Sequence, residues 1–401
     1  MDIRPILTTL RRHKTAAALI VLEVALTCAI LCNAMDLIAN RLVRMQRTTG
    51  MAESELVMVN ITGVGTDANA DALTRSDLVA LRGLPGVRGV TITNQLPYGG
   101  SSWNTGVTLA PDQERSSLVA SMYLAGEDFL ATTGIRLAEG RDFQPGEYID
   151  FTDNNAGRAD PTVILVNRPM AQKLFPDGSA LGRTIYLSKT PVKVIGVIER
   201  LVSVREIRED APAMVLPVRM AYSPGGRYLL RTDTAQRDAV LRAAVDTLQR
   251  NGPNRVLLER RTFEEMKNRF FEGDRAMARL LVAVCVALLV VTALGIVGLA
   301  SFWVQQRTRM IGIRRALGAT RRQILHYFQL ENFLLTSVGV ALGVAGAYAA
   351  NLGLMRHAEL TRLPFAYVAG GAVILWLLGQ LAVLGPALRA AAVPPVVATR
   401  G

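Results

Sequence analysis

The sequence predicts an α+β extracytoplasmic domain inserted between transmembrane helices 1 and 2 of a four-helix, all-α membrane domain with extended stalk helices. Three observations predict this fold class. Four long apolar runs interrupt the 401 residues, strand-like and helix-like patterns alternate between the first two runs, and arginine is concentrated in short segments beside the runs.

Each apolar run is long enough to cross a membrane, which takes about 20 residues. The runs cover residues 15–39, 280–304, 332–355 and 363–388. The first run could instead be a cleavable signal peptide, because basic residues precede it. Its apolar part is longer than the apolar region of a typical signal peptide, which has about 7 to 15 residues. The residues Cys28, Cys32 and Asn33 also make a poor cleavage site, which favours an uncleaved anchor.

Two features of the runs bear on how the helices pack. Glu23 lies in the first run, where a carboxylate that faces lipid costs about 2.5 kcal/mol or more, so we expect it to point into the bundle or to be protonated. The spacing of Gly339, Gly343 and Gly346 in the third run suits close contact with another helix.

The basic side chains of the short segments predict the orientation, because segments rich in lysine and arginine stay in the cytoplasm. The amino tail has four of them, residues 307–322 have six and the carboxyl tail has two, whereas the turn after residue 355 has only two. Both termini are therefore expected in the cytoplasm and residues 41–279 outside. The cytoplasmic pieces hold twelve basic and two acidic residues, or +10, against 31 basic and 28 acidic residues outside, or +3. A nucleic-acid-binding protein would gather its charge on a folded domain, so no nucleic acid is expected.

The sequence offers no catalytic residues, no metal site and no cofactor-binding motif. Its three cysteines all lie in the apolar runs, so the outer segment has no disulfide framework, and its three histidines are scattered. No G-x-x-x-x-G-K-[S/T] loop is present to hold ATP, and neither G-x-S-x-G nor H-E-x-x-H occurs. We therefore expect a non-catalytic chain that binds no cofactor itself.

Alternating patterns in the outer segment predict two β-α-β units with a strand between them. The expected elements, in chain order, are at residues 55–63 (strand), 75–87 (helix), 88–95 (strand), 118–125 (strand), 226–233 (strand), 235–251 (helix) and 254–262 (strand). Residues 127–212, roughly, are interpreted as an inserted subdomain. The outer domain as a whole is expected at 46–262.

Apolar residues at heptad spacing continue the first two membrane helices outward. They are Leu31, Met35, Ile38, Leu42 and Met45 after the first run, and Phe263, Met266, Phe270 and Met277 before the second. We expect these two seams to pack on each other as a stalk, because a flexible linker would be polar and rich in glycine and serine. The alternative is that these residues only cover the underside of the outer domain. The chain is thus expected to divide at residues 1–45, 46–262 and 263–401.

The segment at residues 305–325 holds six arginines and no acidic residue. Its apolar residues Ile311, Ile313, Ala316 and Leu317 recur at helical spacing until Gly318, which predicts a short amphipathic helix on the inner surface. Attraction to anionic lipid would explain the charge without a protein partner. Lysine would serve equally well there, however, and arginine is the side chain that makes bidentate contacts with carboxylates.

The same segment, "QQRTRMIGIRRALGATRRQIL", resembles the cytoplasmic signature of FtsX/MacB-type ABC permeases. The tail "PALRAAAVPPVVATR" (386–400) resembles the closing element of that family, and "VILVNRPMAQKLFPDGSALGRTI" (163–185) resembles a stretch of the MacB-like periplasmic core domain. The family signature forms a coupling helix on the ATP-binding subunit. The resemblance therefore implies a role in ATPase coupling for Arg307, Arg309, Ile311, Gly312, Ile313, Arg314, Arg315, Ala316, Leu317, Gly318, Ala319 and Thr320. Met310 stands where the family has Glu, which leaves room for a paired, non-identical permease.

The resemblance also implies a function and partners. It implies a permease subunit in the bacterial inner membrane that pairs with a second permease copy or paralogue and with an ABC ATP-binding subunit, which binds ATP and Mg²⁺. The stalk would carry ATP-driven motion to the periplasmic domain (mechanotransmission) and drive export or efflux, often through a periplasmic adaptor protein and an outer-membrane channel. The same scaffold could instead serve as an FtsX-like regulator of cell-wall hydrolases or as part of a lipoprotein-releasing complex. A sensor or scaffold without any ATPase is a third alternative.

Overall fold

The computed structural model describes residues 14–64, 69–151, 161–204, 210–223, 225–358 and 362–393. The chain forms two compact units: a helical unit of Met1–Val43 with Gly273–Gly401, and an α/β unit of Arg44–Glu272. The outer domain expected at 46–262 starts close to the α/β unit but ends earlier than it. The basic amino tail before residue 14 and residues 394–400 of the closing motif lie outside the described residues.

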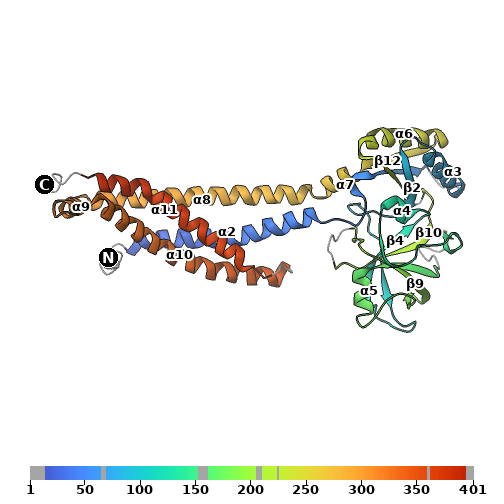
Figure 1. Ribbon diagram of the computed structural model, residues 1–401, viewed down its shortest axis with the longest axis horizontal. Coiled ribbons are helices and arrows are strands. Elements are labelled where there is room, and N and C mark those ends of the chain that lie inside the picture. Colours follow the sequence, from blue (N-terminus) through green and yellow to red (C-terminus); the bar gives the residue numbers. More distant parts are fainter. Residues whose placement is uncertain are drawn as a thin grey trace. The chain divides into compact units, whose positions relative to one another are not determined.

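The helical unit is built from four long helices, each apolar enough to cross a membrane. They are α2 (Lys14–Gln46), α8 (Glu272–Gln306), α10 (Arg321–Ala358) and α11 (Phe365–Ala392), with the short α9 (Thr308–Ala316) between α8 and α10 (Figure 1). The four expected spans coincide with these helices, and each helix extends beyond its apolar run on at least one side. The chain is therefore a multi-pass membrane protein.

Small residues let the helices of this unit approach closely. A Cβ atom at Gly343 of α10 would lie 2.4 Å from Cβ of Cys28 in α2, and one at Gly339 would lie 2.8 Å from Val24. Both distances are shorter than van der Waals contact, so only glycine fits. The close contact predicted at these two glycines is confirmed; at Gly346 the corresponding distance, 3.6 Å, is an ordinary contact.

Polar side chains inside the bundle face other helices. The hydroxyl groups of Thr27 in α2 and Thr292 in α8 lie 2.8 Å apart. A Cβ atom at Gly295 of α8 would lie 2.4 Å from the carboxylate of Glu23, so this carboxylate points at α8, as expected from its cost in lipid.

In the α/β unit, the two predicted β-α-β units interlock. Four strands pair antiparallel in the order β12-β1-β11-β2. Strand β11 of the second β-α-β unit therefore lies between β1 and β2 of the first, and β1 lies between β11 and β12 of the second. This is the arrangement of a ferredoxin-like sheet. Apolar residues of α3 and α6 pack together against one face of the sheet (Figure 1). The elements are β1 (Leu56–Gly63), α3 (Ala70–Arg82), β2 (Val87–Thr93), β11 (Arg227–Thr232), α6 (Arg237–Asn251) and β12 (Arg255–Thr262).

A buried ion pair joins α3 to β12 in this layer. The carboxylate of Asp77 is fully buried, pairs with Arg255, and accepts a hydrogen bond from the Tyr228 hydroxyl at 2.6 Å. Burial, and then the neighbouring carboxylate, raise the pKa of Tyr228 well above its ordinary value, so this hydroxyl stays protonated and donates. Every member of the network has a partner, which is what makes such burial tolerable.

The remaining strands form a six-stranded barrel, because β10 pairs with β4 as well as with β7 and so closes the ring β4-β3-β8-β9-β7-β10. An apolar cluster drawn from all six strands fills it. The inserted part is therefore wider than the predicted 127–212, since β3 and β4 precede residue 127 and β10 runs past residue 212. The elements are β3 (Asn104–Thr108), β4 (Leu118–Ala125), α4 (Phe129–Thr133), β5 (Leu137–Gly140), β6 (Ile149–Asp150), β7 (Val163–Asn167), α5 (Arg168–Leu174), β8 (Thr184–Leu187), β9 (Thr190–Ile198) and β10 (Ala213–Arg219).

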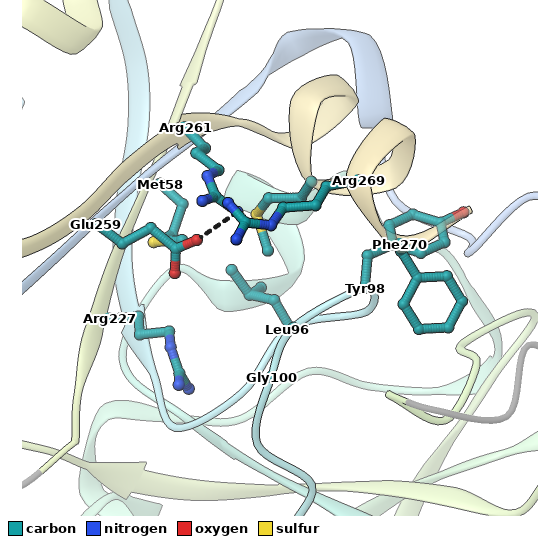
Figure 2. Close-up of a pocket in the computed structure, with 11 residues that line it drawn as sticks. Met58, Leu96, Tyr98, Gly100, Arg227, Glu259, Arg261, Arg269 and Phe270 are labelled. Carbon is teal, nitrogen blue, oxygen red and sulfur yellow. Dashed lines mark ion pairs between the residues drawn. The ribbon is translucent and has the colours of Figure 1, made fainter. Parts of the chain in front are cut away.

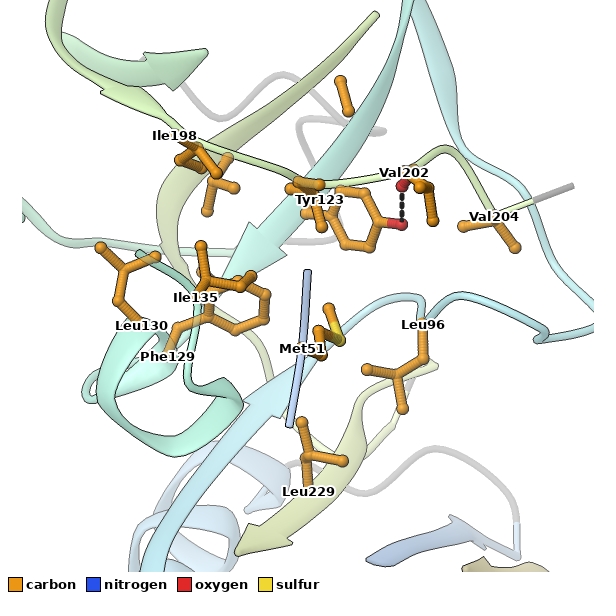
Figure 3. Close-up of a cluster of buried hydrophobic side chains, with 14 of the residues drawn as sticks. Met51, Leu96, Tyr123, Phe129, Leu130, Ile135, Ile198, Val202, Val204 and Leu229 are labelled. Carbon is orange, nitrogen blue, oxygen red and sulfur yellow. Dashed lines mark hydrogen bonds between the residues drawn. The ribbon is translucent and has the colours of Figure 1, made fainter. Parts of the chain in front are cut away.

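A second apolar core joins the barrel to the other face of the ferredoxin-like sheet. Figure 3 shows Met51, Tyr123 and Leu229 among its members, and the hydroxyl of Tyr123 donates to the carbonyl oxygen of Val202 at 2.7 Å. Helix α7 (Phe263–Phe270) packs on the same core and thereby belongs to the α/β unit.

Candidate functional site in the connection between α8 and α10

The candidate site is the short connection that contains α9. Gly318, with φ of +97°, ends this helix in a left-handed conformation that residues with a side chain rarely adopt. Thr320 then begins α10 with reciprocal caps: its hydroxyl accepts from the Gln323 N–H at 3.3 Å, and the Gln323 side chain accepts from the Thr320 N–H at 2.9 Å. The turn and the cap fix where the chain reverses.

A buried ion pair anchors the start of α9. Arg307 Nη1 donates to both carboxylate oxygens of Glu331 in α10, at 2.9 and 3.1 Å, and the two side chains are 7% and 2% exposed. The Arg307 guanidinium also lies 5.5 Å from the ring centre of Trp303 in α8. Three helices therefore meet at Arg307.

The inward side of α9 packs into a small apolar core. Ile311 is 5% exposed, and the other members come from α8, α10 and α11: Val304, Ile324, Phe328, Ala387, Ala390 and Ala391. Near the other end, Arg315 donates to the carbonyl oxygen of Val393, the residue after α11. These contacts hold α9 at both ends against the helical unit.

The outward side of α9 carries an exposed apolar ridge. Met310, Ile313 and Leu317 are 39%, 47% and 84% exposed, and their spacing of three and four residues puts them on one face. Arg309 and Arg314 are exposed beside them. The arrangement is an apolar strip edged by guanidinium groups, which suits a protein surface with an apolar groove and acidic rim.

The predicted coupling residues thus separate into two groups. The inward group fixes α9 and consists of Arg307, Ile311, Gly312 and Arg315. The outward group is exposed and consists of Arg309, Ile313, Arg314, Ala316, Leu317 and Gly318, while Ala319 and Thr320 form the turn into α10. Ile311 faces inward and Ile313 outward, because residues two apart lie on different sides of a helix.

The predicted stalk residues lie in several different environments. Leu31 and Met35 pack within the four-helix bundle, whereas Met45, Phe263, Met266 and Phe270 pack on the core of the α/β unit. Ile38 is half-buried, and Leu42 and Met277 are 47% and 43% exposed. Their role as a stalk stays a prediction.

The second seam also differs from its expected course. α7 and α8 are separate helices with the fully buried Phe271 between them, so the helix expected to continue from Phe263 is interrupted. Within α8, the buried stripe runs through Ala278, Cys285 and Thr292, one residue after the predicted Met277. The alternative interpretation, that these residues cover the α/β unit, therefore applies to Phe263, Met266 and Phe270 in α7.

The partners of the arginines were not predicted from the sequence. Glu331, Trp303 and Val393 lie outside the segment that the sequence singles out. A lone carboxylate at the start of an apolar run, 24 residues after an arginine, was the available signal for the Arg307 pair.

Comparisons with known proteins agree with this organisation. The family model of the MacB-like periplasmic core domain matches residues 26–248, and that of the FtsX-like permease C-terminal region matches residues 282–395. The macrolide export ATP-binding/permease protein MacB of Chromobacterium violaceum is 31% identical over 237 residues, which are 57% of this chain and 35% of that protein. The chain thus spans about a third of that relative.

Two further proteins extend the comparison. The uncharacterized ABC transporter permease YknZ of Bacillus subtilis is 24% identical over 342 residues, 83% of this chain and 80% of that protein. The crystal structure of the periplasmic region of MacB from Actinobacillus actinomycetemcomitans matches 55% of this chain and 93% of its own, with 17% identity and a TM-score of 0.35. Since the first family model matches more than half of the chain and the second matches the helices after it, the chain belongs to the FtsX/MacB-type ABC transporter permeases.

Proposed function

We propose that this permease couples ATP hydrolysis by a separate ABC ATP-binding subunit to conformational change in its periplasmic domain, and that this change drives export or extrusion. The observation that carries the proposal is the exposed ridge of Met310, Ile313 and Leu317 on a helix whose other side packs against the helical unit. ATP and Mg²⁺ would be bound by the partner, because no phosphate-binding loop occurs in the 401 residues.

The geometry of α9 favours a protein partner over lipid. A helix that lies in a lipid surface needs a broad apolar face that is free to insert. Here the opposite side of α9 is already occupied by the contacts of Ile311 and Arg315, and arginines border the exposed apolar strip. An apolar strip with arginine on its edges fits a groove, where binding energy concentrates in a few buried anchors.

The remaining parts of the assembly are inferred from the family. We infer two permease subunits, identical or paralogous, in the bacterial inner membrane with both termini in the cytoplasm. The arginines around α9 support that orientation. Met310, at the position of the family Glu, lies on the exposed ridge, so an acidic contact of the family is replaced here by an apolar one. A periplasmic adaptor and an outer-membrane channel complete the proposal.

The experiment is a copurification of the permease with its ATP-binding subunit from co-expressing cells. Leu317→Glu places a charge at the most exposed residue of the ridge without touching the inward contacts of α9, and we expect the ATP-binding subunit to be lost from the complex. Gln306→Glu introduces the same charge change at an exposed position just before α9 and is the control. Membrane levels of both variants should equal those of the parent protein. Undiminished copurification with Leu317→Glu would refute the role of the ridge.

A further inference from the structure

The α/β unit contains a cavity with a charge pattern that the proposed function does not use. The cavity has a volume of about 340 Å³ and lies between the end of β12, helix α7 and the loop after β2. This is the low end of the range of about 300–1,000 Å³ for small-molecule sites, so it suits a small molecule and not a polypeptide. All of its lining residues belong to the α/β unit.

Positive charge dominates the wall of this cavity. The register of the sheet explains it: Arg227 and Glu259 both lie opposite Asn60 of β1, and Arg261 lies opposite Met58, so these side chains emerge near one another. Arg269 of α7 adds a third guanidinium group (Figure 2). Glu259 pairs with Arg261 at 2.8 Å, so a single carboxylate is set against three guanidinium groups.

The charge of Arg227 is only partly compensated within the protein. One of its nitrogens donates to the carbonyl oxygen of Asn94, a neutral partner. Burial lowers the pKa of Arg227, and the nearby Glu259 only opposes this effect in part. A desolvated guanidinium without a full counter-charge attracts an anion. Among the described residues, Arg269 has no carboxylate partner either, and it is exposed at the rim.

Most of the remaining side chains in the cavity wall are apolar, and one of them, Tyr98, has a strained backbone conformation. Leu96, Tyr98, Met266 and Phe270 supply apolar surface, and the Tyr98 ring packs 5.5 Å from Phe270. Tyr98 has φ of +66°, a conformation that a bulky residue rarely adopts. Its hydroxyl donates to Glu53 at 3.3 Å, so contacts on the far side hold the residue in place. Strained residues of this kind cluster at sites that bind ligands.

We propose that this cavity binds a small amphipathic anion, with a phosphate or carboxylate head on Arg227 and Arg269 and a short apolar tail against Leu96, Met266 and Phe270. The proposal does not depend on the proposed function, because it rests on the α/β unit alone. The head would make charge-assisted hydrogen bonds, and the tail would lie along the apolar wall of the cavity, where Phe270 is half-buried and Leu96 and Met266 are buried.

Calorimetric titration of the full chain in lipid nanodiscs tests the proposal, with empty nanodiscs as reference. Hexyl phosphate is the probe, and hexanol and inorganic phosphate are its uncharged and tail-less counterparts. We expect saturable binding of hexyl phosphate that is at least about fivefold tighter than that of either counterpart, since the head and the tail both contribute. If hexanol bound as tightly as hexyl phosphate, the proposed role of the anionic head would be overturned. If inorganic phosphate bound as tightly, the proposed role of the apolar tail would be overturned.

The variants locate the site. Arg269→Gln removes an exposed guanidinium group and should leave the fold intact. It should weaken the binding of hexyl phosphate by at least about fivefold. Arg242→Gln on the exposed surface of α6 makes the same charge change and should leave the affinity unchanged. No saturable binding to the parent protein, or equal weakening by the two variants, would overturn the proposal.

Discussion

Replacing Glu331 with leucine should destabilise the helical unit by about 3–5 kcal/mol, because it leaves the Arg307 guanidinium buried without a counter-charge. The magnitude comes from the geometry. At 2.9 Å and an effective dielectric constant of about 20, the Coulomb attraction of the pair is about 6 kcal/mol, most of which offsets the desolvation of two side chains that are 7% and 2% exposed. Removing one partner loses the attraction but keeps the desolvation of the other.

A double variant separates the pair from simple packing. Arg307→Met with Glu331→Leu replaces both charges by apolar side chains of similar size, and we expect it to be within about 1 kcal/mol of the parent protein, since well-packed replacements of buried pairs are often neutral. Unfolding in mixed micelles, titrated with sodium dodecyl sulfate and followed by the loss of helical circular dichroism, gives the free energies of the four proteins. The coupling energy from this cycle should then be several kcal/mol.

Two results would refute this reasoning. A loss below about 1 kcal/mol for Glu331→Leu would mean that water reaches the pair, so that it behaves as a surface ion pair. A double variant as unstable as the sum of the two single variants would mean that the side chains matter for their shape and not for their charges.

Three further changes should have distinct effects. Gly343→Leu forces α2 and α10 apart and should lower the yield of folded protein by more than Gly298→Leu, whose site has open space around it; equal yields would contradict the close packing. Asp77→Asn removes the charge from the buried network of the α/β unit and should cost about 3–5 kcal/mol in thermal unfolding, against less than about 1 kcal/mol if the pair were solvated. The hydrogen bonds from Arg141 lower the pKa of Glu147, so its contribution is present above the ordinary carboxyl pKa and is lost as the pH falls through the lowered value. The free energy of unfolding of the parent protein, obtained from thermal unfolding, should therefore exceed that of Glu147→Gln at pH 7, by no more than about 1 kcal/mol, and the two values should converge in acid; a difference that grows in acid would have the wrong sign.

Much of the fold was predictable because it depends on local pattern. Hydropathy alone places the four membrane helices, and alternation places the strand at 118–125, which is β4. The strand order was not predictable, because no local signal says that β1 lies between β11 and β12. Nor was the closure of the barrel, which depends on pairing between β4 and β10, nearly a hundred residues apart in the chain.

The candidate site was predictable in position but not in detail. The arginines and Gly318 mark the segment, yet α9 has only nine residues and apolar side chains on more than one side, so periodicity cannot say which side is buried. The buried side of α9 is determined by contacts with distant segments of the chain, namely with Glu331 in α10 and with Val393 after α11. Leu317, which has the shape of a core residue, is instead 84% exposed and is the strongest indication of a partner.

The proposed transmission of motion depends on α8 more than on the paired seams expected from the heptads. α7 is fixed in the α/β unit by reciprocal caps between Thr262 and Glu265 and by Phe271, which is fully buried. Glu272 then begins a helix that runs without a break to Gln306, directly before α9. A single continuous helix therefore joins the α/β unit to the connection that carries the ridge, and a displacement can be carried along it only if it is stiff.

A Gly-Gly insertion after Ala276 tests this role of α8. The insertion lies before the apolar run of α8, and each glycine destabilises the helix by about 1 kcal/mol. Two added residues also rotate the rest of the helix by about 200°. An insertion after Phe271, by contrast, would fall where α7 and α8 are already separate. We expect ATP hydrolysis by the assembled complex to persist and export to be lost, because the nucleotide sites would lie in another subunit. The same insertion after Asp112, in an exposed loop of the α/β unit, is the control and should leave both activities unchanged. Intact export with the Ala276 insertion would make α8 a spacer, and mechanotransmission through it would have to be withdrawn.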